Sequence, residues 1–92
     1  MPLYKVQKRN GSIVDFELGK IRDAITKAAE AVGMTEPAIP EALLTETEVT
    51  LEELYGEEIP TVEQIQDVVE DVLIRFDYAD MAKAYILYRQ KR

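Results

Sequence analysis

Residues 6–11 read Val6-Gln7-Lys8-Arg9-Asn10-Gly11, so two adjacent cations stand directly before an Asn-Gly pair. Short runs of alternating apolar residues lie on both sides, at residues 4–8 and 12–16. Asn-Gly between two such runs favours a β-hairpin with a type I′ turn, in which both central residues have positive φ. We therefore expect a hairpin that carries Lys8 and Arg9 at its tip.

The composition is that of one small folded domain. The chain has 92 residues, 47% of them hydrophobic, which is enough for a single core. No apolar run approaches the roughly 20 residues of a membrane span, and the N-terminus lacks the apolar core of a secretory signal. We therefore expect a cytoplasmic location. The sequence has no cysteine and no histidine, which removes disulfides, thiol nucleophiles, the usual zinc ligands and the most common general base.

Charge is distributed unevenly along the chain. The net charge of −7 argues against direct nucleic-acid binding, because neutralising phosphates takes a surplus of Lys and Arg. Residues 1–14 hold three bases and residues 81–92 hold four, both without an acid, whereas residues 15–80 hold four bases and all 18 acids. Either the basic ends only aid solubility, or the fold brings them together in one cationic site.

Apolar residues at helical spacing predict four helices. Their expected ranges are 18–32, 40–55, 62–76 and 80 or 81 to 89. The apolar stripe of the third helix consists of Val62, Ile65, Val68, Val69, Val72, Leu73 and Phe76. Thr61 is the expected N-cap of this helix, with Gln64 completing a capping box. In the last helix, Ala82, Tyr85 and Ile86 are expected to point inward.

These elements predict an α+β fold, a small four-helix bundle capped by a two- or three-stranded β-sheet. Residues 57–59 are the candidate third strand. Two or three short strands cannot bury an apolar face alone, and they must therefore pack on the helices. Such a fold can bring the start of the first helix and the end of the last helix beside the hairpin.

Two features of the helices have more than one reading. Lys20 lies near the start of the first helix, where the helix dipole disfavours a cation. It either points to solvent at little cost or faces a bound anion. Six acids on and after the second helix form either a solvated face or a partner surface; they are Glu46, Glu48, Glu52, Glu53, Glu57 and Glu58.

Two parts of the chain resemble the ATP-cone family. They are residues 6–11, 14–17, 20–21 and 24–25 in the first half, and residues 61–70 and 82–89 in the second. The resemblance implies a non-catalytic, nucleotide-binding regulatory domain over residues 1–92. Such cones occur at the N-terminus of ribonucleotide reductases, where ATP activates and dATP inhibits, and in the bacterial repressor of reductase genes. The chain lacks the cysteines of both, so it is expected to be a fragment or a stand-alone cone.

The resemblance also implies a set of phosphate contacts. These are Lys8, Arg9, Lys20, Tyr88 and Arg89. Asn10 and Gly11 form the turn that aims the hairpin cations. Residues expected around the base and ribose are Val6, Phe16, Glu17 and Ile21, together with Val62, Ile65 and Gln66 at the start of the third helix.

The implied ligand is ATP or dATP, which usually arrives with Mg²⁺, although no residue matches a metal ligand. Hydrolysis is not expected, because the sequence contains no GxxxxGK[ST] motif. The expected partners are a parent reductase or a second copy of the chain, with no membrane. The alternatives are a helical protein-interaction module, part of a nucleotide-responsive transcriptional regulator, and an acid–base enzyme using Glu63 and Asp67. The enzyme is disfavoured because these acids fall on the polar face of a helix.

Overall fold

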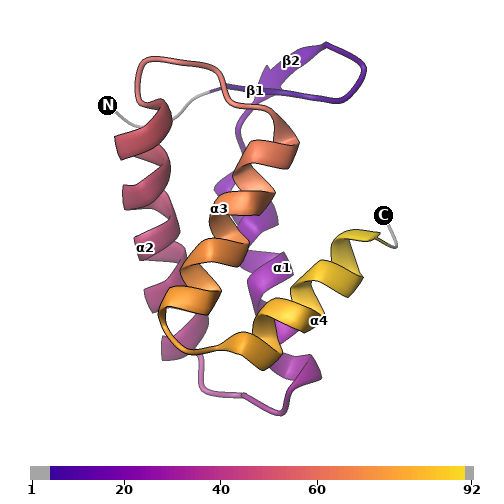
Figure 1. The fold of residues 1–92 in the computed structure, drawn as a ribbon, viewed down its shortest axis with the longest axis vertical. Helices are drawn as coiled ribbons and strands as arrows, with labels where there is room; N and C mark the ends of the chain where they lie inside the picture. The colour runs from indigo at the N-terminus through magenta and orange to yellow at the C-terminus, as the bar shows by residue number, and fades with distance from the viewer. Residues whose placement is uncertain (1–4, 91–92) are drawn as a thin grey trace.

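Two short strands and four helices make up residues 5–90, the part of the chain described by the computed structural model (Figure 1). They are β1 (Lys5–Gln7), β2 (Ile13–Asp15), α1 (Leu18–Ala31), α2 (Ala38–Tyr55), α3 (Val62–Arg75) and α4 (Ala79–Gln90). The predicted α+β fold is confirmed, and every predicted helix end lies within two residues of the observed one. The expected strand residue Tyr4 and the terminal cations Lys91 and Arg92 lie outside the described residues.

The helices pack in a ring, in which α1 and α3 each lie against both α2 and α4. Successive helices run in opposite directions, so the N-terminal ends of α1 and α3 share the end of the bundle that carries the hairpin (Figure 1). None of the helices in residues 5–90 combines the length and the apolar character needed to cross a membrane.

Apolar side chains from all four helices and β1 form one core. Its fully enclosed members are Ile25, Leu51, Val69, Val72, Leu73 and Met81. Two expectations about this core were wrong. Phe76, the C-cap of α3, is 46% exposed and lies outside the core. Met81, which was not expected to point inward, is completely buried.

The hairpin pairs Val6 with Val14 in an antiparallel register. The predicted type I′ turn is wrong, because Gly11 has a positive φ of 88° and Asn10 does not. Instead Gly11 N–H donates to the carbonyl of Lys8 (2.9 Å) and Lys8 N–H donates to the carbonyl of Ser12 (2.8 Å). This is the three-residue loop in which a β-turn is followed by a left-handed glycine.

The side chain of Asn10 explains the change of turn. Its Oδ1 accepts hydrogen bonds from Ser12 N (3.0 Å) and Ser12 Oγ (2.6 Å). Such Asx contacts stabilise a turn without a left-handed backbone at the asparagine itself. The cations at the tip therefore sit on a loop that is one residue longer than expected.

Residues 57–59, the candidate third strand, form no strand, so of the two alternatives the sheet is the two-stranded one. The chain reaches β1 only after them, where Gln7 N–H donates to the carbonyl of Pro60 (2.9 Å) and Gln7 forms a single parallel bridge with Thr61. Thr61 is already the N-cap of α3, so the chain turns into a helix before a ladder can develop.

The capping box at the start of α3 is confirmed. Thr61 N–H donates to Gln64 Oε1 (2.8 Å), and Gln64 N–H donates to Thr61 Oγ1 (3.1 Å). These two bonds satisfy donors that a helix N-terminus otherwise leaves to solvent. Because Thr61 also bridges to β1, the cap fixes the position of α3 relative to the hairpin.

Candidate functional site

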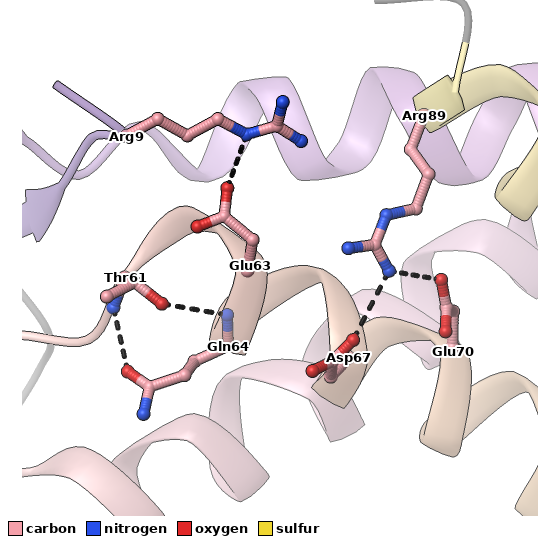
Figure 2. Close-up of polar contacts among 7 residues, drawn as sticks. All are labelled: Arg9, Thr61, Glu63, Gln64, Asp67, Glu70 and Arg89. Carbon is pink, nitrogen blue, oxygen red and sulfur yellow. Dashed lines mark hydrogen bonds and ion pairs between the residues drawn. The ribbon is translucent and has the colours of Figure 1, made fainter.

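The site predicted from the sequence lies where the hairpin meets the first two turns of α3. The backbone tie from Gln7 to Pro60 holds the two segments together, and it brings the hairpin tip to the acidic side of α3. Figure 2 shows that Arg9 from the tip and Arg89 from α4 both reach carboxylates on α3. Residues from the two ends of the described chain thus meet on one helix.

Arg9 is bound by Glu63 in the first turn of α3. Arg9 Nε donates to Glu63 Oε1 over 2.6 Å, while the Arg9 side chain remains 79% exposed. This hydrogen bond lowers the pKa of Glu63 below its ordinary value, and its effect exceeds that of desolvation, which acts in the opposite direction. Glu63 is therefore a carboxylate at neutral pH, and most of the guanidinium of Arg9 still faces solvent.

Arg89 is held more firmly than Arg9. Its Nη1 donates to Asp67 Oδ1 (3.3 Å) and in a short contact to Glu70, and its side chain is only 18% exposed. Burial by itself would lower the pKa of Arg89, but the hydrogen bonds that Arg89 donates to Glu70 and Asp67 raise it. Nearby, burial raises the pKa of Tyr85 to about 12.

The two lysines of the predicted site differ in their surroundings. Lys20 Nζ forms an exposed ion pair with Glu17 Oε2 at 3.1 Å. Glu17 is the N-cap of α1 but makes no capping hydrogen bond with its side chain, and the first turn of α1 holds no acid. Lys8 is exposed and forms no ion pair within residues 5–90. The N-terminus of α1 is thus an electropositive helix end without a capping side chain.

The apolar residues of the predicted site belong to the core or pack on it. Val6, Ile21 and Ile65 are buried, with exposed fractions of 6–8%. Phe16 and Val62 are partly buried and pack against the same core. These five residues therefore form an apolar layer beneath the hairpin end of the bundle.

Three further residues were predicted for the site. Gln66 on α3 is partly buried, and its Oε1 has no hydrogen-bond partner within the described residues. Tyr88 is partly buried near the end of α4, where Lys27 Nζ lies 5.3 Å from the centre of its ring. Gly11 leaves open space on its Cβ side at the hairpin tip, so the loop surface there is unobstructed.

Sequence reasoning missed the partners of the two arginines. Glu63, Asp67 and Glu70 were interpreted as part of the charged face of the helix, and Glu63 and Asp67 also as acid–base groups, but none was expected to bind an arginine. Their signal was the spacing 63, 67 and 70, which places three acids on one helical face. No arrangement of three or more acidic side chains suited to a metal ion occurs in residues 5–90.

Comparison with known proteins identifies the family. The sequence matches the ATP cone domain over residues 4–92, so the chain belongs to the ATP-cone family. It is 44% identical over 93 residues to the vitamin B12-dependent ribonucleoside-diphosphate reductase of Thermoplasma acidophilum. It is 37% identical over 92 residues to the anaerobic ribonucleoside-triphosphate reductase of Haemophilus influenzae.

These relatives are much longer proteins. The alignments cover 96% and 100% of this chain but only 12% and 13% of the two reductases. The vitamin B12-dependent reductase of Mycobacterium tuberculosis strain H37Rv is 36% identical over 88 residues, again 12% of its length. The similarity therefore concerns one domain-sized region of each relative.

Proposed function

We propose that this domain binds a purine nucleoside triphosphate, ATP or dATP, and acts as an allosteric regulatory domain of a ribonucleotide reductase. The observation that carries the proposal is that Arg9 from the hairpin tip and Arg89 from α4 both bind carboxylates of α3, Arg9 in its first turn and Arg89 closer to its middle. Membership of the ATP-cone family and similarity to reductases support the same conclusion.

The charges at this end of the bundle suit a polyphosphate. A nucleoside triphosphate carries about four negative charges at neutral pH, and the cations proposed to meet it are Lys8, Arg9, Lys20 and Arg89. The uncapped N-terminus of α1 adds unpaired backbone N–H groups, which favour anions. Arginine suits the role because its planar fork of N–H donors can bind two phosphate oxygens at once.

The apolar layer beneath the hairpin end of the bundle suits the nucleoside. The base and ribose would lie against Phe16 and Val62, which are partly exposed at the edge of the core. Gln66 follows Val62 by one turn of α3, and its side-chain oxygen is buried without a hydrogen-bond partner among the described residues. Mg²⁺ would enter bound to the phosphates, since the proposal needs no metal ligand from the protein.

Calorimetric titration tests the proposal. We expect ATP and dATP each to release or absorb heat with a dissociation constant in roughly the micromolar range, which corresponds to about −8 kcal/mol. Lys8→Ala should weaken binding by roughly ten-fold, because one charge at an effective dielectric near 20 contributes on the order of 1–3 kcal/mol. Lys8 has no ion-pair partner among the described residues, so its loss should leave the fold intact.

Lys83→Ala is the matched control. It removes the same charge from an exposed position on α4 outside the proposed site, and it should change the affinity less than two-fold, roughly, at physiological salt. Absence of heat with both nucleotides would refute the proposed function. Equal weakening by the two substitutions would refute the assignment of Lys8 and leave nucleotide binding intact.

A further inference from the structure

Three acids on α3 form what we call the carboxylate row: Glu63, Asp67 and Glu70. The row lies along one face of the helix, and Figure 2 shows Glu63 beside Arg9 from the hairpin, and Asp67 and Glu70 on either side of the guanidinium of Arg89 from α4. Glu63 binds Arg9, and the other two bind Arg89. Every arginine of the proposed phosphate site is therefore already occupied by a carboxylate of this row.

Carboxylates and phosphates compete for the same donors. A guanidinium presents its N–H groups in a fixed plane, and an oxyanion of either kind binds in that plane. Glu63 takes Nε of Arg9, and the row takes Nη1 of Arg89. A phosphate that arrived beside these carboxylates would be repelled by them unless it took their place.

The pair at Arg89 is enclosed enough for this competition to matter. Arg89 is 18% exposed and Glu70 21% exposed, so their attraction is screened less than that of a surface pair. At Arg9 the pair is more open, because Glu63 is 40% exposed. A phosphate should therefore displace the carboxylate more easily at Arg9 than at Arg89.

We infer that the carboxylate row is a built-in competitor for the two arginines, and that triphosphate binding exchanges carboxylate for phosphate on them. This inference rests on the proposed nucleotide binding at the same site. It gives the three acids a role in setting the affinity, because they compete with the phosphates of the ligand for the two arginines. The affinity of the domain is then set by the balance of four cations against the row.

The test is calorimetric titration of ATP into Glu63→Gln and Asp67→Asn, each compared with the unaltered chain. Both substitutions keep the shape of the side chain and remove the negative charge. We expect each to tighten ATP binding by roughly two- to five-fold, the upper part of the range of one weakened competing ion pair. Asp67 is 70% exposed, so its replacement disturbs the packing least. Thermal unfolding followed by circular dichroism checks that both variants fold.

Glu48→Gln is the matched control. Glu48 is exposed on α2, so this change raises the net charge by the same amount away from the row. At about 0.15 M salt, where the Debye length is about 8 Å, it should change the ATP affinity less than two-fold. Equal tightening by all three variants would overturn the inference, because it would reveal a general charge effect.

The remaining outcomes separate the inference from the proposed function. If the unaltered chain binds ATP and neither row variant binds more tightly, the arginine pairs are structural and the inference is overturned while the function stands. If neither the unaltered chain nor any variant binds ATP, the proposed function fails and the inference fails with it. Movement of the Nε–H NMR signals of Arg9 and Arg89 on ATP addition is the expected direct sign of the exchange.

Discussion

At the scale of single residues, two helices of this domain end in the same way with different residues. The N–H groups of Gly33 and Met34 close α1, and those of Asp77 and Tyr78 close α3 by the same pair of bonds. The residue after the cap has positive φ in both, 82° at Gly33 and 65° at Asp77. Glycine adopts this conformation without strain, whereas aspartate does not.

Asp77→Gly should therefore stabilise the domain by about 0.5–1 kcal/mol, because it relieves the left-handed strain at the end of α3. Urea unfolding followed by circular dichroism measures the change. Gly33→Ala is the reciprocal substitution and should destabilise by about 1 kcal/mol, although nothing lies within 4 Å of the added Cβ. A loss of stability in Asp77→Gly would contradict this account and point to a role for the carboxylate.

At the scale of elements, the start of α3 combines a helix cap with a tertiary contact. Thr61 caps the helix through Gln64 and bridges to Gln7 in β1. Loss of the cap should therefore loosen both the first turn of α3 and its attachment to the hairpin. The residues that bind Arg9 lie within this turn.

Thr61→Ala should destabilise the domain by about 1 kcal/mol, the usual effect of removing a capping hydroxyl. Thr61→Ser keeps the hydroxyl and should recover most of the loss. Thr35→Ala is the control, because Thr35 is exposed in the loop before α2. Chemical denaturation compares the four proteins, and equal stability of Thr61→Ala and the unaltered chain would show that the box contributes nothing.

The elements also show what the sequence could and could not predict. Helix bounds followed from periodicity, and the box at Thr61 and Gln64 followed from its spacing, because both are local patterns. The turn type was wrong, since the hydrogen bonds of the Asn10 side chain compete with the left-handed preference of an Asn-Gly pair. The sequence left two or three strands open, and the third does not form, since only one bridge is made before α3 begins.

The partners of the site cations were beyond local patterns. Arg9 and Glu63 lie 54 positions apart, and Arg89 and Glu70 lie 19 apart. Which acid meets which arginine depends on how the hairpin and α4 dock on α3. The resemblance to a family assigned the cations a ligand, but it did not assign them the carboxylates that hold them in its absence.

At the scale of the whole molecule, stability should fall at acidic pH. Two ion-paired carboxyls whose pKa values are lowered in the folded state, Asp15 and Glu63, contribute to this loss. The hydrogen bond from Lys5 lowers the pKa of Asp15 below its ordinary value, and the hydrogen bond from Arg9 lowers the pKa of Glu63 in the same way. A carboxyl whose pKa is lowered in the folded state stabilises it above the unfolded pKa. That stabilisation is lost as the pH falls through the folded pKa.

The difference in stability between the unaltered chain and Glu63→Gln isolates one of these contributions. We expect the unaltered chain to be the more stable at pH 6, and the difference to shrink once the pH falls below about 4.5. Urea midpoints at a series of pH values measure it. Glu48→Gln, at a residue with no such partner, should show a difference that does not vary in this way. A difference in stability that grows as the pH falls would contradict the assignment of this effect to the Glu63–Arg9 ion pair.

The bond between Gln7 and Pro60 has a consequence for the order of folding. It closes a long loop of chain, and loop closure is entropically more costly for long separations than for a hairpin or a single helix. The hairpin and α1 can form early, whereas their docking on α3 waits for most of the chain. A ligand held at that junction would stabilise the folded state, and it would slow unfolding to the extent that its contacts are absent from the transition state. Occupancy of the site would set how long the domain stays folded.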